Sequence, residues 1–399
     1  MKRIAIVETD ARGGLIHFAY HMADALAAEG SDVTLVTGSD YELAAQPHRF
    51  SARPILKLWP QFDQSSANPL LRRVRRAWRA FVLLREWSRL TLYLLRSKPD
   101  VVIFSIVRFP FLAIFLKVLH ASGIDLTQLC HEFEKRDETP GFWHRVEDRL
   151  FAATYRQFSS IFFLSQNIRD DFLARHAIPA RTCLLPHPPQ HALLGSDLPV
   201  ETVQNRLGLS PKDRIVLFFG LLRPSKGVDD LVQAFSLLGD MHHLKLVICG
   251  YPSNNFDTRA IQALAEQLGV TSRTVFAFEY LPNDAVAPLL SLAEVVVFPY
   301  RNATASGALA LAQGLGRPVV ATSVSGLTEA IEHGVTGRLA APGMPQSLAA
   351  EIRAVLEDAA AADGMGLAAR RLFDEERSWH VLATRLLACL DKRDPQERR

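Results

Sequence analysis

Short apolar runs alternate with longer segments of helical periodicity along most of the chain. Residues 3–7 (RIAIV) form the first run, two glycines follow, and the apolar positions of residues 15–26 recur every three or four places. Short apolar runs are typical of parallel strands buried on both faces, and the longer spacing is typical of a helix. The opening therefore predicts a strand, a glycine turn at Gly13 and Gly14, and a helix that ends near Gly30.

The same alternation continues in two series, which a proline-rich segment separates. The apolar runs are DVTLVT, VVIFSIV, LTQLC, SIFFLS and RTCLLP in the first series, and RIVLFFG, LKLVICG, TVFAFEY, EVVVFPY and RPVVAT in the second. Residues 186–199 (PHPPQHALLGSDLP) have no periodicity and predict a linker. We expect an α/β protein of two Rossmann-like domains that face each other across a cleft, at residues 1–190 and 191–375. A helix within residues 376–399 should pack across both.

Composition agrees with a globular protein that has no membrane span. The chain has 399 residues, of which 48% are hydrophobic and 22% are charged. Residues 101–119 are largely apolar, but Arg108, Pro110 and Lys117 interrupt them, and a spanning helix needs ~20 apolar residues. The opening run is too short for a signal peptide. We therefore expect a cytoplasmic protein whose four widely spaced cysteines are reduced, packed thiols.

The net charge of +3 hides a basic segment in the first half. Between residues 72 and 98 there are nine lysines and arginines and one acidic residue, Glu86. Leu71, Val74, Trp78 and Phe81 lie three or four residues apart, with arginines between them. Such a helix can lie on an anionic bilayer, and Trp78 and Trp87 favour this interpretation. The alternative is a surface helix whose apolar side faces the core.

The candidate membrane contact consists of six side chains: Arg72, Arg73, Arg75, Arg76, Trp78 and Arg79. A basic segment can also bind nucleic acid, but no nucleic-acid motif accompanies it, so no nucleic-acid partner is expected.

Two loops of the second series have the chemistry of a phosphate site. Open α/β sheets bind ligands beyond the carboxyl ends of their strands. In LFFGLLRPSKG, Arg223 and Lys226 stand at the start of a predicted helix near Gly227, where unpaired N–H groups favour anions. In FPYRNATASGAL, the small residues Ala305, Ser306 and Gly307 would let a diphosphate approach the backbone. A solvated basic turn and an ordinary serine N-cap are the alternatives.

Two loops of the first series could contact the other side of a ligand. Gly13 and Gly14 do not form a dinucleotide fingerprint, but they could admit a sugar or a phosphate. His131 directly follows an apolar run and precedes four carboxylates within residues 132–138. That loop could place a histidine and a carboxylate against a donor and an acceptor hydroxyl. No histidines have metal-ligand spacing, so no metal is expected.

These motifs together resemble the large family 4 of retaining glycosyltransferases, over nearly the full length of the chain. GLLRPSKG resembles that family's phosphate-binding turn, GRPVVATSVSGLTEAI resembles its helix–strand–turn after the donor site, and EHGVTGRL and Ser378–Trp379 also fit. Gly13–Gly14 and His131 stand where the family has its glycine loop and donor-site histidine.

The resemblance implies a GT-B fold and a metal-independent hexosyltransferase without a cofactor. Such an enzyme transfers a sugar from a UDP- or GDP-linked donor to a lipid-linked or polysaccharide acceptor, with retention of configuration. Arg223, Lys226, Ala305, Ser306 and Gly307 would bind the diphosphate. His131 would orient and polarise the donor sugar, and Tyr280 and Leu281 would lie near the base. The acceptor would bind to the N-terminal domain, on a protein attached peripherally to the inner face of the cell membrane.

The chain departs from the family pattern at the donor helix. The family has two glutamates separated by seven residues, and the corresponding positions are Ala303 and Leu311. Leu221 also stands where an arginine is common. A non-catalytic GT-B protein that binds a glycan, a nucleotide or a partner transferase is therefore the second hypothesis. A nucleotide-sugar epimerase of related fold is the third.

Overall fold

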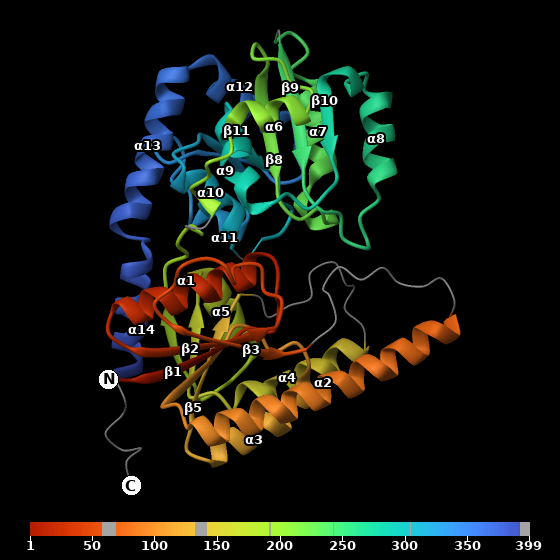
Figure 1. The fold of residues 1–399 in the computed structure, drawn as a ribbon. Coiled ribbons are helices and arrows are strands. Elements are labelled where there is room, and N and C mark those ends of the chain that lie inside the picture. Colours follow the sequence, from red (N-terminus) through yellow and green to blue (C-terminus); the bar gives the residue numbers. More distant parts are fainter. Residues whose placement is uncertain (58–68, 132–141, 191–192, 242, 304, 392–399) are drawn as a thin grey trace. The chain divides into compact units, whose positions relative to one another are not determined.

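The computed structural model divides the chain into two compact α/β units (Figure 1). It describes residues 1–57, 69–131, 142–190, 193–241, 243–303 and 305–391. The chain crosses between units at Pro186/His187 and again at Ser378/Trp379. The sequence prediction placed these boundaries at 190/191 and 375/376. The C-terminal helix belongs to the first unit.

The first unit is built on a seven-stranded parallel sheet of order β3-β2-β1-β4-β5-β6-β7. Side chains alternate between its faces: Ala5 and Val7 join a core formed with the helices α2 and α3, whereas Ile4 and Ile6 are buried on the opposite face. Both faces are therefore covered, as the apolar runs predict. The strands are β1 (Arg3–Val7), β2 (Asp32–Gly38), β3 (Ser51–Leu56), β4 (Val101–Phe104), β5 (Asp125–Cys130), β6 (Ser160–Phe163) and β7 (Arg181–Leu184). The helices are α1 (Gly14–Ala28), α2 (Pro69–Ser97), η1 (Pro110–Leu112), α3 (Ala113–Ala121), α4 (Phe142–Tyr155), α5 (Gln166–Arg175) and α14 (Trp379–Asp391).

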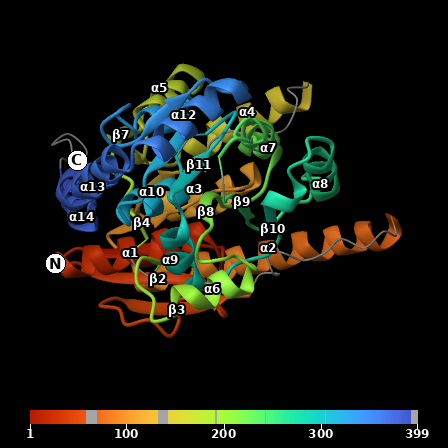
Figure 2. The same ribbon diagram turned by 90° about the horizontal axis from the view of Figure 1, so that it is seen from above.

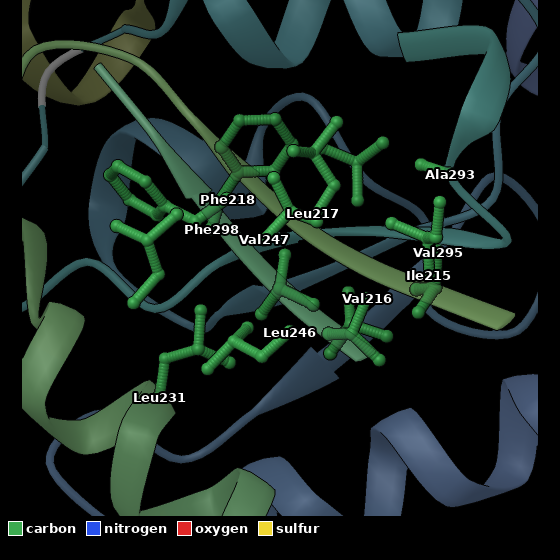
Figure 3. Close-up of a cluster of buried hydrophobic side chains, with 14 of the residues drawn as sticks. Ile215, Val216, Leu217, Phe218, Leu231, Leu246, Val247, Ala293, Val295 and Phe298 are labelled. Atoms are coloured by element: carbon green, nitrogen blue, oxygen red, sulfur yellow. The ribbon is translucent and has the colours of Figure 1, made fainter. Parts of the chain in front are cut away.

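The second unit has a six-stranded parallel sheet of order β10-β9-β8-β11-β12-β13. Figure 3 shows its centre, where Phe218 of β8, Val247 of β9 and Phe298 of β11 pack with Leu231 of α7. The strands are β8 (Arg214–Phe219), β9 (Leu244–Cys249), β10 (Thr274–Ala277), β11 (Val295–Phe298), β12 (Val319–Thr322) and β13 (Arg338–Ala340). The helices are α6 (Val200–Arg206), η3 (Pro224–Lys226), α7 (Val228–Ser236), α8 (Thr258–Gln267), η4 (Thr271–Arg273), α9 (Asn283–Leu292), α10 (Gly307–Gly314), α11 (Ser325–Thr328), α12 (Pro345–Glu357) and α13 (Ala359–Glu375).

The predicted alternation of strands and helices is confirmed, with two strands missed. The edge strands β3 and β13 have no continuous apolar run, because β3 is mostly exposed and β13 is three residues long. The apolar stretch at residues 101–119 divides into β4, η1 and most of α3, so it is not one continuous helix. Within the described residues, no helix is long and apolar enough to cross a membrane.

The expectation of four reduced thiols was wrong for one pair. Cys183 of β7 and Cys389 of α14 form a disulfide, with their Cα atoms 6.6 Å apart, while Cys130 and Cys249 are buried free thiols. The paired cysteines are 206 residues apart in sequence, so no local spacing could reveal them. The bond joins an edge strand to the C-terminal helix. A salt bridge from Lys2 to Asp391 (2.5 Å) and a hydrogen bond between His380 and Glu29 (2.6 Å) attach the same helix.

Replacing Cys389 with serine should lower the free energy of unfolding of the first unit by about 2–5 kcal/mol, because the disulfide restricts the unfolded chain. All five tryptophans lie outside residues 187–378, so their fluorescence during urea unfolding reports on the first unit. Reduced wild-type protein is the matched control and should unfold at the same urea concentration as the variant. A thiol assay on the unreduced, unfolded chain should detect two free thiols, and detection of four would exclude the bond.

The carboxyl ends of three strands in the second unit approach one another so closely that two positions accept only glycine. A Cβ atom at Gly250, after β9, would lie 1.8 Å from the carbonyl oxygen of Gly220, after β8. A Cβ atom at Gly227 would lie 2.0 Å from the carbonyl oxygen of Pro299, after β11, and Gly227 has a φ of +59°. These glycines fix the distances between the loops that follow β8, β9 and β11.

Gly250→Ala should destabilise the second unit by roughly 2–4 kcal/mol, because the backbone of the β8 turn must move to make room. Gly364→Ala in α13 is the matched control, since its Cβ would meet nothing within 4 Å. That substitution should leave stability unchanged or raise it, by up to about 1 kcal/mol. Urea unfolding followed by circular dichroism should show the Gly250→Ala shift, while the tryptophan transition stays in place. Equal stability of the two variants would contradict the close approach.

Candidate functional site

The loop after β8 brings a buried lysine to the carboxyl edge of the second sheet. Lys226 is 8% exposed, and its Nζ lies 3.5 Å from the centre of the Tyr300 ring in the loop after β11. The face of an aromatic ring attracts a cation through the ring's quadrupole. Arg223, three residues earlier, is half-buried in the same turn. α7 begins directly after this turn, with Gly227 as its N-cap, as the sequence predicted.

Tyr300 links this turn to the predicted small-residue loop. Its hydroxyl lies 3.3 Å from the Oγ of Ser306. Ser306 is the N-cap of α10, and its Oγ accepts a hydrogen bond from the Leu309 amide at 3.2 Å. The loop after β11 thus uses Ser306 as an ordinary N-cap, and it also places Ala305 and Gly307 beside the amino end of a helix. The structure brings the two predicted phosphate-binding loops together through Lys226, Tyr300 and Ser306.

An arginine that the sequence analysis did not single out neutralises the acidic residues beside this site. Arg301 donates from Nη2 to Asp229 at 2.6 Å and to Asp230 at 2.7 Å, and its Nε donates to Asp230 at 2.9 Å. The hydrogen bonds to Asp230 are the main cause of the raised pKa of the Arg301 guanidinium. Its backbone amide also bonds to the Ser225 carbonyl at 2.8 Å. Two carboxylates in the first turn of α7 are thereby paired, which reduces their repulsion of an anion.

The turn predicted to lie near the base contains one exposed and one buried side chain. Tyr280 is 38% exposed, whereas Leu281 is 9% exposed and lines a cavity of about 50 Å³. Glu279 lines the same cavity and pairs with Arg206 at 2.8 Å. This cavity has room for water but not for a nucleobase.

A buried histidine lies near the amino end of α10. A Cβ atom at Gly307 would lie 3.8 Å from the His187 ring and 3.3 Å from the Nε2 of Gln190. Burial lowers the pKa of His187 to about 4, so the ring is neutral at pH 7. This position of His187 was not predicted from the sequence. Among the described residues, no group of three histidine, cysteine, aspartate or glutamate side chains could hold a metal ion.

The family glutamate positions are part of the hydrophobic core. Ala303 is 1% exposed and Leu311 is 2% exposed, and both belong to the buried cluster of the second unit. Neither side chain can offer a polar group to a ligand.

In the first unit, the glycine turn is held by a carboxylate. Gly13, with a φ of +86°, is the N-cap of α1, and its amide donates to the Oε1 of Glu42 at 2.6 Å. The same Oε1 lies 2.9 Å from the Nε2 of the buried His17. Gly14 is the first residue of the helix. The predicted ligand contact at Gly13 thus has an internal hydrogen bond at its N–H group.

His131 lies directly after β5, as the apolar pattern predicted. The side chain is half-buried, and its ring packs edge-on against Phe18 of α1, with centroids 5.0 Å apart. The four carboxylates that follow, Glu132, Glu134, Asp137 and Glu138, lie outside the described residues.

A second polar cluster in the first unit was missed by the sequence analysis. Glu8 follows β1 and is fully buried, and its Oε1 accepts a hydrogen bond from the Asp10 amide at 2.7 Å. Burial, and then the nearby Asp10 charge, raise the pKa of Glu8 to about 8. Arg108, in the loop after β4, forms a salt bridge with Asp10. The available signal was a charged residue directly after each of two apolar runs.

The predicted membrane helix divides into two halves. Val74, Trp78 and Phe81 are 60%, 60% and 57% exposed, and Arg73 and Arg76 are exposed beside them. Figures 1 and 2 show this first half of α2 projecting beyond the sheet of its unit.

The remaining members of the candidate contact differ in exposure. Arg75 and Arg79 are half-buried, and the side chain of Arg72 lies outside the described residues. The use of Trp87 as a membrane signal was wrong, because Trp87 is 3% exposed and stacks on Phe104 in the core, with centroids 5.7 Å apart.

The first unit also has an open hollow of about 780 Å³, which lies away from these groups. Its walls include Lys2, Asp100 and Asp391, at the amino ends of the strands. Open α/β sheets bind ligands at the other end, so we do not assign this hollow to the site.

Comparison with known proteins identifies both halves of the chain. Residues 12–188 match the model described as Glycosyltransferase Family 4, and residues 213–358 match the model described as Glycosyl transferases group 1. Among curated relatives, the D-inositol 3-phosphate glycosyltransferases of Corynebacterium glutamicum (strain R) and Jonesia denitrificans are 33% and 32% identical over 168 and 193 residues. These matches cover 41% and 47% of this chain, and they span 40% and 45% of the two relatives.

Solved structures match the fold over nearly the whole chain. Sucrose-phosphate synthase from Thermosynechococcus elongatus has a TM-score of 0.74 at 18% identity, covering 98% of each chain. HepE from Anabaena, in complex with UDP, has a TM-score of 0.73 at 17% identity, covering 98% of this chain and 100% of HepE. The two parallel α/β units thus have the GT-B fold, and the chain belongs to the glycosyltransferases of family 4 and group 1.

Proposed function

We propose that this glycosyltransferase transfers a hexose from a UDP- or GDP-linked donor to a lipid-linked or polysaccharide acceptor, with retention of configuration and without a metal ion. The second unit would bind the donor and the first unit the acceptor. The observation that best supports this is the position of Lys226 over Tyr300, which contacts the N-cap of α10. A cation and two helix amino ends at one edge of a sheet are suited to a diphosphate.

The same groups would stabilise the leaving group. As the bond from the sugar to the diphosphate breaks, negative charge accumulates on the phosphate oxygens, and fixed positive groups lower the energy of that state. Lys226, Arg223 and the amino ends of α7 and α10 would supply them in place of a metal. The departing phosphate would help to deprotonate the acceptor hydroxyl. His131 would orient and polarise the donor sugar rather than act as a nucleophile.

The comparisons support the donor part of this proposal. HepE has been solved with UDP and with UDP-glucose. A UDP-linked donor is therefore the first to test.

A non-catalytic protein of the same fold is the second candidate. Two observations favour it: Ala303 and Leu311 replace the family carboxylates, and Glu42 bonds to the Gly13 amide of the glycine turn. Such a protein would bind a nucleotide or a glycan without transferring a sugar.

Lys226→Ala should weaken UDP binding by roughly 10- to 100-fold, because a buried cation that contacts phosphate is worth about 1.5–3 kcal/mol. Arg223→Ala should act in the same direction. Isothermal titration calorimetry with UDP, GDP and their hexose conjugates measures the effect. Lys212→Ala removes an exposed lysine before β8 and is the matched control.

The result of this titration separates the two candidates. UDP or GDP binding that depends on Lys226, together with release of the hexose from the conjugate, supports the transferase. Binding without turnover in any condition supports the non-catalytic protein. Equal affinity in the Lys226 and Lys212 variants would remove the proposed phosphate site.

We also propose that the first half of α2 attaches the protein to the inner face of the cell membrane. Its exposed apolar side chains, Val74, Trp78 and Phe81, accompany arginines, and an anionic bilayer would contact both. Soluble proteins rarely expose a contiguous aromatic and aliphatic surface without a binding partner.

Arg73→Gln combined with Arg76→Gln should weaken binding to phosphatidylserine vesicles by roughly tenfold or more, because each basic residue contributes about 1 kcal/mol. Co-sedimentation with vesicles, compared with pure phosphatidylcholine, measures the change. Arg96→Gln combined with Lys98→Gln is the matched control, since both residues are exposed at the other end of the same segment. If both pairs of substitutions reduced binding equally, general basicity rather than this helix face would be responsible.

A further inference from the structure

The strand order of the first sheet reverses between β1 and β4, and three polar side chains lie across this point. The chain passes from β1 to β2 on one side, and the later strands extend from β4 on the other. The register continues past the strand ends, because the Glu8 amide bonds to Val36 and the Ser105 amide bonds to Val7. Thr37, Glu8 and Ser105 are therefore neighbours on three adjacent strands. Open α/β sheets bind ligands at such a reversal.

Glu8 is buried there without full hydrogen bonding. Its side chain is 0% exposed, and its Oε1 accepts a hydrogen bond from the Asp10 amide, whereas its Oε2 has no hydrogen-bond partner among the residues that the structure describes. Ser105 is close enough to lower the pKa of Glu8 slightly, but its hydroxyl makes no hydrogen bond of normal geometry. A buried carboxyl oxygen without a partner is costly, so Glu8 is a candidate for a role beyond packing.

Asp10, which is hydrogen-bonded to Glu8, belongs to a partly exposed ion pair. Asp10 forms a salt bridge with Arg108, and their side chains are 9% and 40% exposed. The same loop continues into Phe109 and Phe111, which are 40% and 41% exposed and whose rings stack with centroids 5.5 Å apart. The loop after β4 therefore offers a charged pair and an aromatic surface within four residues.

We infer that Asp10 and Arg108 form a subsite for the hydroxyl groups of a neutral sugar on the acceptor, and that Glu8 is its positioning residue. This inference rests on the proposed function, since it names the acceptor chemistry of the first unit. A carboxylate accepts hydrogen bonds from one hydroxyl, and a guanidinium donates to the oxygen of a neighbouring hydroxyl. Glu8 acts through Asp10, because the Oε1 of Glu8 accepts a hydrogen bond from the Asp10 amide.

The charges of the cluster favour a neutral ligand over a phosphorylated one. The charged groups facing Glu8 are Asp10, which raises its pKa, and Arg108, which lowers it. Below the raised pKa of Glu8, about 8, Glu8 is neutral and Asp10 balances Arg108. Above that pH, Glu8 ionises beside Asp10, and the cluster becomes negative. Sugar binding should therefore be steady at neutral pH and should decline as the pH rises through about 8.

The test uses the full chain and octyl β-glucoside, octyl β-galactoside and octyl α-mannoside as probes, below their micelle concentrations. Saturation-transfer NMR identifies the glycoside that binds, and titration gives its affinity. Asp10→Asn and Arg108→Gln should each weaken binding by about tenfold or more, because each removes charge-assisted hydrogen bonds. Asp32→Asn, an exposed carboxylate at the amino end of β2, is the matched control and should leave the affinity unchanged.

The dependence of glycoside affinity on pH separates a positioning role of Glu8 from a purely structural one. Glu8→Gln should keep the neutral-pH affinity and abolish the decline above pH 8, because glutamine imitates the protonated acid. Glu8→Ala should bind weakly at every pH, because it loses the bond to the Asp10 amide. A wild-type profile identical to that of Glu8→Gln would overturn the role of Glu8.

UDP calorimetry on the same samples distinguishes the two proposals. Retained UDP binding with glycoside affinity unchanged in Asp10→Asn would overturn this subsite and leave the transferase intact. Stronger binding of myo-inositol phosphate than of every glycoside would overturn the neutral-sugar assignment. If the wild-type protein did not bind UDP, that result would contradict the proposed donor site instead.

Discussion

Both units depend on the burial of parallel sheets on both faces. In such a sheet the central strands have apolar neighbours above and below, so most charged side chains lie in the loops and at the strand ends. Lys226 and Tyr300 follow β8 and β11, and Glu8 and Arg108 follow β1 and β4. The sheets therefore select where chemistry can occur, and the glycine contact between Gly220 and Gly250 fixes how closely adjacent loops approach.

The two sites use their charges in opposite ways. In the second unit, Arg301 pairs with Asp229 and Asp230, so the acidic residues near the helix amino ends are neutralised while Lys226 rests on an aromatic ring. This distribution of charge favours the binding of an anion. In the first unit, Asp10 and Arg108 pair with each other over a buried carboxyl group. That arrangement offers hydrogen bonds with little net charge, which suits hydroxyl groups. The donor and acceptor sites that we propose would thus differ in their charge balance.

The sequence predicted the features that depend on local pattern. Apolar runs located the central strands, and Gly30 and Gly227 marked a helix end and a helix start, because these properties involve neighbouring residues. The disulfide between Cys183 and Cys389 and the position of Arg301 depend on residues distant in sequence, so no local pattern could show them. Trp87 was misassigned because one helix, α2, packs against the core with its second half and is exposed along its first.

Alanine and leucine in place of the family carboxylates change the charge at the carboxyl edge of the second sheet, where we propose that the donor binds. The edge itself stays in place. Ala303 and Leu311 are packed in the core, so a glutamate at either position would require burial of a charge or a different packing. Without those carboxylates, and with Asp229 and Asp230 paired to Arg301, repulsion of a diphosphate is reduced. If the donor binds as we propose, the contacts with the ribose and the sugar that the family resemblance assigns to these carboxylates would be absent. This chain should therefore rely on the diphosphate for donor affinity and discriminate less sharply between the sugars attached to it.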